Sequence, residues 1–178
     1  MPTLVEPTVA VHRSFLEAWD ELGPQEERWM GARGLWKDWS RQDLEDPEEF
    51  ARMVEAIRAE ALWETDIPPD LVHQTVLWFV DGDEWLGRLA IRHHLTPPLL
   101  ELGGHIGYVV RPSARRKGYA TQMLTQSLPW VARLGIDTAL VTCDNDNHPS
   151  RRVIESAGGE LEDERHGKLR FWVPTRVV

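Results

Sequence analysis

The stretch Arg111-Pro112-Ser113-Ala114-Arg115-Arg116-Lys117-Gly118-Tyr119-Ala120 joins a β-rich run to a helical one. The residues before it, His105–Val110, are typical of a strand, and Thr121–Leu134 after it has a helical pattern that ends at Gly135. The first turn of a helix has unpaired backbone N–H groups and the positive end of the helix dipole. Three consecutive basic residues and a glycine lie at that end. The stretch therefore predicts either a phosphate-binding loop or an ordinary basic loop that caps a surface helix.

Two other phosphate-binding motifs are absent here. No Gly-Lys-Ser/Thr follows, as a P-loop requires, and no Gly-x-Gly-x-x-Gly fingerprint is present. The charge distribution still supports a local anion site, because residues 102–136 contain five basic and no acidic side chains. Residues 1–101, in contrast, contain nine basic and 21 acidic side chains. The net charge of −9 for the whole chain argues against the broad cationic surface of a nucleic-acid-binding protein.

Length and composition narrow the remaining possibilities. A chain of 178 residues, 42% of them hydrophobic and 28% charged, is expected to form a single soluble domain over residues 1–178. The one cysteine, Cys143, excludes a disulfide framework and a multi-cysteine zinc site, and we expect no metal. No apolar run approaches the roughly 18 residues of a membrane span, and the N-terminus lacks the pattern of a signal peptide. We therefore expect a cytoplasmic protein without membrane partners.

Residues 1–71 are predicted to be rich in helix. Thr3–Glu6 can form a short strand, and apolar residues at helical spacing over residues 11–22 predict a helix that a Gly-Pro pair stops. Residues 25–45 are polar and rich in tryptophan, which predicts an irregular or weakly helical cover. Asp46, followed by Pro and two Glu, marks the start of a further helix.

Residues 72–173 are predicted to alternate between strands and helices. Thr96-Pro97-Pro98 is predicted to be a loop, residues 149–157 a short helix, and Pro129 is expected to perturb the helix around it. The predicted strands are Gln74–Val80, Glu84–Arg92, His105–Val110, Thr138–Cys143, Glu160–Arg165 and Lys168–Val173. We therefore predict an α/β (α+β) fold with a mixed, mostly antiparallel central sheet of about seven strands flanked by helices.

Several motifs in this order resemble the GNAT superfamily of N-acetyltransferases. Residues 115–120 resemble its Gln/Arg-x-x-Gly-x-Gly/Ala signature, with Tyr108-Val109-Val110-Arg111-Pro112 before it. Asn147 and Ile154-Glu155-Ser156-Ala157-Gly158-Gly159 resemble the family's Asn-x-x-Ala/Ser-x-x-x-Tyr-Glu-x-x-Gly pattern apart from its Tyr. Arg92-His93-His94 and residues 103–108 also resemble a bacterial subgroup of predicted acetyltransferases. The resemblance covers about residues 72–173, which would form the sheet and the acetyl-CoA-binding core, while residues 1–71 would form the acceptor side.

The resemblance implies that acetyl-CoA is the cosubstrate and that its acetyl group passes directly to a primary amine of a small molecule or protein. Tyr108, Val109 and Val110 match the strand that pairs with the pantetheine arm. The loop that holds the pyrophosphate matches Arg115, Arg116, Lys117, Gly118, Tyr119, Ala120 and Thr121. Asn147 matches a residue that contacts the cofactor arm. Because the family forms no covalent enzyme intermediate, Cys143 is expected to be structural.

Direct aminolysis requires a neutral amine, a polarised carbonyl and a proton for the leaving thiolate. A backbone N–H near Val110 can polarise the carbonyl. The candidate bases are His105, which titrates near neutrality, and Glu101, whose pKa burial would have to raise; a purely structural His105 is the alternative. Ile154 replaces the Tyr that protonates the thiolate in many members. The proton donor is therefore either water or Tyr108, whose side chain faces either the site or the core.

The sequence leaves the acceptor open. The excess of acidic residues over residues 1–101 favours a cationic amine, and the tryptophans of this part would either form a cation–π pocket or fill the core. The tryptophans meant are the four concentrated between residues 19 and 39, namely Trp19, Trp29, Trp36 and Trp39. A non-catalytic acyl-CoA-binding module is the alternative function, since Ile154 removes the usual acid. We expect acetyl-CoA and an amine as partners, no nucleic acid, and a monomer or homodimer.

Overall fold

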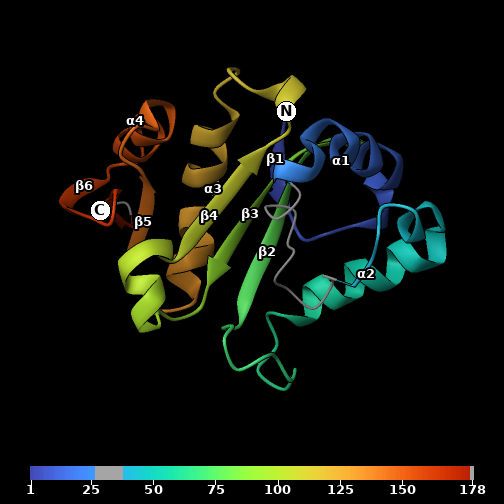
Figure 1. Ribbon diagram of the computed structural model, residues 1–178, viewed down its shortest axis with the longest axis horizontal. Coiled ribbons are helices and arrows are strands. Elements are labelled where there is room, and N and C mark those ends of the chain that lie inside the picture. The colour runs from blue at the N-terminus through green and yellow to red at the C-terminus, as the bar shows by residue number, and fades with distance from the viewer. Residues whose placement is uncertain (27–37, 177–178) are drawn as a thin grey trace.

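The computed structural model describes residues 1–26 and 38–176. Its centre is a seven-stranded sheet in the order β1-β2-β3-β4-β5-β7-β6 (Figure 1). The strands are β1 (Thr3–Val5), β2 (Gln74–Asp81), β3 (Glu84–Arg92), β4 (Ile106–Val110), β5 (Thr138–Asp144), β6 (Glu160–Arg165) and β7 (Lys168–Pro174). Neighbouring strands are antiparallel except for β4 and β5, which are parallel. The predicted mixed, mostly antiparallel sheet is confirmed.

Helices cover both faces of this sheet (Figure 1). The helices are α1 (His12–Glu26), α2 (Pro47–Ala59), α3 (Tyr119–Arg133) and α4 (His148–Ser156). Side chains alternate along each strand, so Trp78 and Ala90 pack with α1 and α2, whereas Leu77 and Leu89 pack with α3 and α4. Because both faces of the sheet are buried, the sequences of the central strands are nearly continuous apolar runs.

Local sequence signals set the ends of the first two helices. The Asp46 carboxylate accepts a hydrogen bond from the Glu48 N–H (2.8 Å), and Pro47 occupies the first position of α2, as predicted. In α1 the helical backbone is interrupted at Gly23, where φ is 64° and ψ is 178°. Of the predicted cover, residues 38–45 include a short 3-10 turn, Asp43–Glu45, whose Leu44 is buried.

Of the four tryptophans between residues 19 and 39, the two that the structure describes serve packing. Trp19 is buried in the core under α1, with its ring 6.1 Å from that of Phe15. Trp39 packs against the same core, and its indole Nε1–H donates to Glu49 (3.0 Å). Trp29 and Trp36 lie outside the described residues. These contacts favour core filling over a cation–π pocket for Trp19 and Trp39.

The prediction of a loop at residues 96–98 was wrong in part. Pro97 and Pro98 begin a helical segment that continues as a short π-helix, η4 (Leu99–Gly103). Proline is well tolerated in a first helical turn, where its missing N–H would have no partner, so these residues start the segment rather than prevent it. α3 likewise continues through Pro129.

Within residues 1–26 and 38–176, no helix combines the length and the apolar composition that crossing a membrane requires.

Candidate functional site

The parallel strands β4 and β5 diverge from one point of contact. They pair only at Ile106 and Val141. On its other side β4 is fully paired with β3, and this ladder uses the backbone groups of alternate residues. The N–H and C=O groups of Tyr108 and Val110 therefore point toward β5, which has already moved away. The result is a cleft of about 880 Å³ with strand backbone along one wall.

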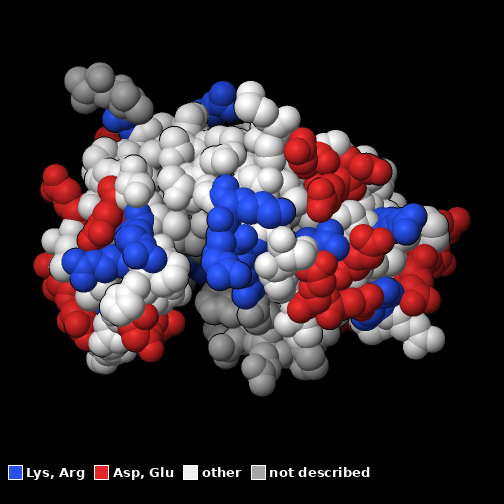
Figure 2. Space-filling view, turned by 90° about the horizontal axis from the view of Figure 1, so that it is seen from above, with Lys and Arg blue, Asp and Glu red and all other residues white. Residues whose placement is uncertain are grey.

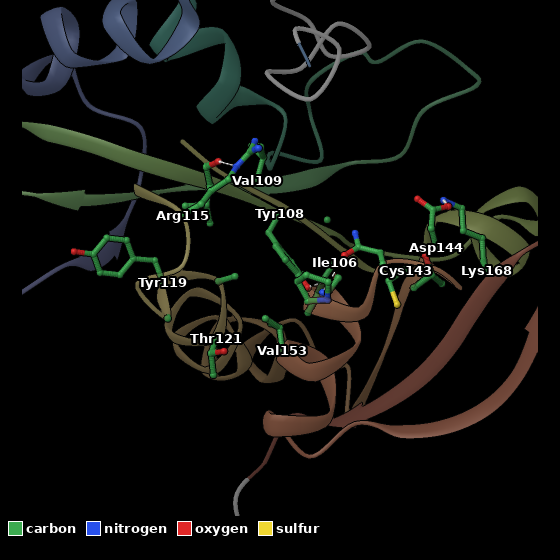
Figure 3. A pocket seen from close by; sticks show the side chains of 18 of the residues that line it. Ile106, Tyr108, Val109, Arg115, Tyr119, Thr121, Cys143, Asp144, Val153 and Lys168 are labelled. Carbon is green, nitrogen blue, oxygen red and sulfur yellow. Dashed lines mark hydrogen bonds and ion pairs between the residues drawn. The ribbon is translucent and has the colours of Figure 1, made fainter. Parts of the chain in front are cut away.

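The cleft is also lined by the loop after β4, the start of α3, the end of β5 and the start of α4 (Figure 3). Nearly all of the predicted cofactor residues line it. They are Tyr108, Val109, Val110, Arg115, Arg116, Gly118, Tyr119, Ala120, Thr121 and Asn147. Lys117 does not line it and is exposed. The structure thus brings together residues that are up to 39 positions apart in the sequence.

The loop before α3 has the backbone geometry of an anion cradle. Arg116 (φ 61°) and Gly118 (φ 77°) both adopt left-handed conformations, which turn successive N–H groups toward one side. A Cβ added to Gly118 would meet no atom within 4 Å, so open space lies in front of the first turn of α3. Figure 2 shows this face, where Lys and Arg side chains gather at the middle and acidic side chains flank them. These features fit a pyrophosphate group.

Two side chains of this loop have defined partners. Arg115 Nε donates to the carbonyl oxygen of Val110 (3.0 Å), which places its guanidinium beside the end of β4 (Figure 3). The Tyr119 ring packs edge-on against Phe79, with ring centroids 5.6 Å apart. Tyr119 is therefore anchored in the core, and its backbone rather than its phenol is suited to contact a phosphate.

An ion pair between the buried Arg111 and the exposed Glu21 joins this loop to α1. Arg111 is 7% exposed and contacts Glu21 (Nη2 to Oε1, 2.7 Å) and the Ser14 hydroxyl (3.0 Å). The other oxygen of Glu21 accepts a hydrogen bond from the Ser113 N–H (3.1 Å). Burial opposes ionisation of Glu21, but the hydrogen bonds from Arg111 and Ser113 outweigh it and lower the pKa of this carboxyl. Glu21 thus fixes both the start and the direction of the loop.

Tyr108 points into the cleft rather than only into the core. Its hydroxyl lies 2.6 Å from the Ser150 hydroxyl of α4 (Figure 3). Burial raises the pKa of Tyr108 to about 12, so the phenol keeps its proton at neutral pH. Asn147 caps α4 by accepting a hydrogen bond from the Ser150 N–H (3.1 Å). Sequence reasoning missed Ser150, although its position three residues after Asn147 in the family motif was a usable signal.

The two predicted bases lie outside the cleft lining. Glu101 Oε1 contacts Arg165 Nη1 (2.8 Å), which ties η4 to the hairpin of β6 and β7. His105 is buried, and its Nδ1 accepts a hydrogen bond from the Leu140 N–H (2.9 Å). With Nδ1 accepting, the ring proton is on Nε2, and neither nitrogen is available to take a proton from an amine. This geometry argues against His105 as the base.

The cleft lining also includes Arg92, Cys143, Asp144 and Lys168, which were not predicted as functional. Asp144 pairs with Lys168 (2.5 Å), and Arg92 donates from Nη1 to the carbonyls of Gly103 and Gly104 (both 3.0 Å). Cys143 also lines the cleft, but burial, and secondarily Asp144, raises the pKa of its thiol. The thiol therefore stays protonated, in keeping with a structural role.

An open mixed sheet whose two parallel strands diverge beside a helix start with the geometry of an anion cradle is the architecture of a CoA-dependent acyltransferase. A family model described as acetyltransferase (GNAT) domain matches residues 14–160. The chain therefore belongs to the GNAT acetyltransferase family and is an acetyl-CoA-dependent acyltransferase. A search of curated proteins finds no match.

Solved structures with the same fold include three acetyltransferases. The microcin self-immunity acetyltransferase MccE, in complex with acetyl-CoA and AMP, has a TM-score of 0.59 and 14% identity, covering 97% of this chain and 92% of MccE. RimJ of Mycobacterium smegmatis, in complex with a CoA disulfide, has a TM-score of 0.63 and 17% identity (97% and 81% covered). RimL, a ribosomal-protein acetyltransferase in complex with coenzyme A, has a TM-score of 0.58 and 18% identity (96% and 92% covered). At these identities the likeness shows the fold.

We predict that Gly118→Asp weakens acetyl-CoA binding at least about tenfold, because it sets a negative charge and a strained φ at the anion cradle. Gly135→Asp is the matched control. Gly135 ends the same helix with φ 78° and equally open space around its Cα, but it lies at the opposite end from the cleft. Isothermal titration calorimetry measures both affinities. Equal affinities for the two variants would show that the cradle is misassigned.

We predict that Glu21→Gln lowers the free energy of unfolding by about 1 kcal/mol at pH 7, because Arg111 loses its nearest carboxylate. Since the pKa of Glu21 is lowered on folding, its contribution is present above the ordinary carboxyl pKa and is lost as pH falls through the lowered value. Urea unfolding at pH 7 and at pH 3 measures this difference. Glu17 lies on the same helix, with its carboxylate 3.6 Å from Arg111. Glu17→Gln should therefore lower the free energy of unfolding by less than Glu21→Gln does.

Proposed function

We propose that this chain is an N-acetyltransferase that moves the acetyl group of acetyl-CoA to a primary amine of a small molecule or a protein. The divergence of β4 and β5 carries this proposal, because it offers backbone donors and acceptors to the pantetheine arm and leads it to the middle of the sheet. We assign the arm to Tyr108, Val109, Val110 and Asn147 and the pyrophosphate to residues 115–121. The N–H of Val110 points into the gap and is suited to polarise the thioester carbonyl.

The proton for the leaving thiolate comes, in this proposal, from Tyr108. Ile154 cannot donate one, but the Tyr108 phenol lies in the same cleft, keeps its proton at neutral pH and contacts the Ser150 hydroxyl. As the C–S bond breaks, the phenol proton passes to sulfur. The Tyr108 phenolate is then reprotonated through the Ser150 hydroxyl, which gives up its own proton as it takes one from water. Two hydroxyl groups from β4 and α4 thereby substitute for the missing tyrosine, and this supports an enzyme over a non-catalytic acyl-CoA-binding module.

In this proposal, the proton of the attacking acceptor amine is transferred to water. Glu101 contacts Arg165, and His105 is held by Leu140, so neither presents a free basic atom to the cleft. An amine that enters as its neutral form needs only a water molecule to accept the proton after attack. On this basis the pH dependence of kcat/KM follows the pKa of each acceptor amine, without an inflection from an imidazole.

The acidic surface of residues 1–101 gives little support to a cationic acceptor. Many of its carboxylates are paired with nearby arginines: Asp20 and Glu45 contact Arg41, and Glu48 and Glu49 contact Arg52. Glu17 and Glu21 contact Arg111.

We propose that the acceptor reaches the thioester from the face of the sheet that α1 and α2 cover. RimL acts on a ribosomal protein, so peptides belong in the acceptor search beside small amines.

The direct test measures free thiol released from acetyl-CoA in the presence of polyamines, amino sugars and peptides with free N-termini. We expect turnover with at least one amine and an acetylated product of the corresponding mass. Tight acetyl-CoA binding without turnover on the whole panel would instead favour the binding module. Calorimetric titration with acetyl-CoA runs in parallel, because it separates a missing acceptor from a missing cofactor site.

We predict that Tyr108→Phe lowers kcat by tenfold to about a hundredfold while acetyl-CoA affinity changes less than about threefold, since only the hydroxyl is removed. Ser150→Ala should lower kcat by a smaller factor. Ser156→Ala is the matched control on α4, because its hydroxyl contacts only the Arg152 carbonyl (2.6 Å) in the part of the chain that the structure describes. Full activity of Tyr108→Phe would leave water as the proton donor.

A further inference from the structure

The contact point of β4 and β5 is built around one residue, His105. Its backbone N–H donates to the Leu140 carbonyl (2.7 Å), and its ring Nδ1 accepts a hydrogen bond from the Leu140 N–H (2.9 Å). Both backbone polar groups of Leu140 are therefore satisfied by a single residue. His105 is 7% exposed, so these two hydrogen bonds form away from bulk water.

An ordinary parallel ladder would use a backbone carbonyl at this position. Extending the Ile106–Val141 register by one step toward the N-terminus would pair the Leu140 N–H with the carbonyl of Gly104. That carbonyl instead accepts a hydrogen bond from Arg92 Nη1 (3.0 Å). Gly104 has φ 63°, and a Cβ there would lie 2.4 Å from the Leu140 carbonyl oxygen. Only glycine allows this turn, and the His105 ring takes the place of the diverted carbonyl.

The segment before the turn is fixed by side chains from three strands. Arg92 of β3 contacts the carbonyls of Gly103 and Gly104, Thr142 of β5 donates to the Leu102 carbonyl (2.8 Å), and Arg170 of β7 donates to the Leu100 carbonyl (3.0 Å). These bonds satisfy carbonyls at the end of η4 that have no helical partner. The chain therefore enters β4 at a defined position, and His105 meets Leu140 in one arrangement.

We propose that His105 is a positioning residue whose ring holds β5 to β4 at the base of the acetyl-CoA cleft, so that the strands diverge directly beyond it. The proposal rests on the acetyl-CoA site described above. A ladder that continued with backbone bonds would bring Thr142 and Tyr108 together and close the gap. The His105–Leu140 hydrogen bonds fix the two strands on the N-terminal side of the Ile106–Val141 pair, and the cleft opens on the C-terminal side of that pair. His105 thus sets where the cleft begins.

The arrangement requires a neutral ring with its proton on Nε2. Burial, and secondarily the positive charge of Arg92, lowers the pKa of His105 to about 4, which keeps the ring neutral at physiological pH. Ring nitrogen chemical shifts report the tautomer directly in the wild-type protein. We expect Nδ1 to show the shift of an unprotonated acceptor and Nε2 that of an N–H from pH 8 down to pH 5.5. A protonated Nδ1 in this range would overturn the proposal.

Two variants of equal shape separate positioning from catalysis. His105→Asn keeps an acceptor at the place of Nδ1, whereas His105→Leu has the same branched shape and no acceptor. We expect His105→Asn to bind acetyl-CoA within about threefold of wild type and to retain kcat, and His105→Leu to bind about tenfold more weakly. Equal binding by both variants would overturn the proposal. So would a large loss of kcat in His105→Asn at unchanged affinity, because it would make His105 a base.

A negative result for the role of His105 can be distinguished from a failure of the proposed N-acetyltransferase activity. Acetyl-CoA affinity and the ring tautomer are measured without any amine acceptor, so an inactive protein can still support or refute the role of His105. If His105→Leu does not fold, the comparison of His105→Asn with wild type and the tautomer measurement still decide the question. Circular dichroism and thermal unfolding of each variant accompany the titrations.

Discussion

The structure depends on one constraint, which is that two parallel strands in the middle of the sheet pair at a single position. An unpaired strand edge in a protein interior leaves N–H and C=O groups without partners, and such groups are costly to bury. Along β4 this edge borders the cleft, where the backbone groups of Tyr108 and the N–H of Val110 face the gap and the Val110 carbonyl accepts a hydrogen bond from Arg115. A ligand with an amide-containing arm can form hydrogen bonds with the backbone groups that face this gap. The helices, the loop before α3 and the hairpin of β6 and β7 are arranged around this gap.

Each wall of the cleft is fixed by a contact with a distant part of the chain. Glu21 of α1 holds Arg111 and Ser113, so the cofactor loop is fixed from the opposite face of the sheet. α4 is linked to β4 through the hydroxyls of Tyr108 and Ser150. α1 and the loop before α3 are therefore mechanically one unit, although they come from different thirds of the sequence. The acidic residues of α1 acquire a role in this framework that their total charge did not indicate.

Features encoded by neighbouring residues could be predicted from the sequence, and features that depend on divergence of the strands could not. The Asp46 cap, the strands around residues 74–92 and the glycine at the start of α3 each depend on local backbone preference, and their local structure is as predicted. The orientation of His105 depends on Gly104 and Leu140, 36 positions apart, so its titration range alone suggested a base. The contact of Glu101 was likewise not predictable from neighbouring residues, because its partner Arg165 lies in the last hairpin.

The strand order β5-β7-β6 has a consequence for synthesis of the chain on the ribosome. β7 is the last strand to be made, yet it inserts between β5 and β6 and pairs with β5 over the whole length of residues 138–144. Until then β5 is an apolar strand with both edges open except at Val141, which is the kind of segment that aggregates. The site thus becomes a stable cleft only after residues 168–174 have been made, and a nascent chain that lacks them would expose β5 to chaperones or to other chains.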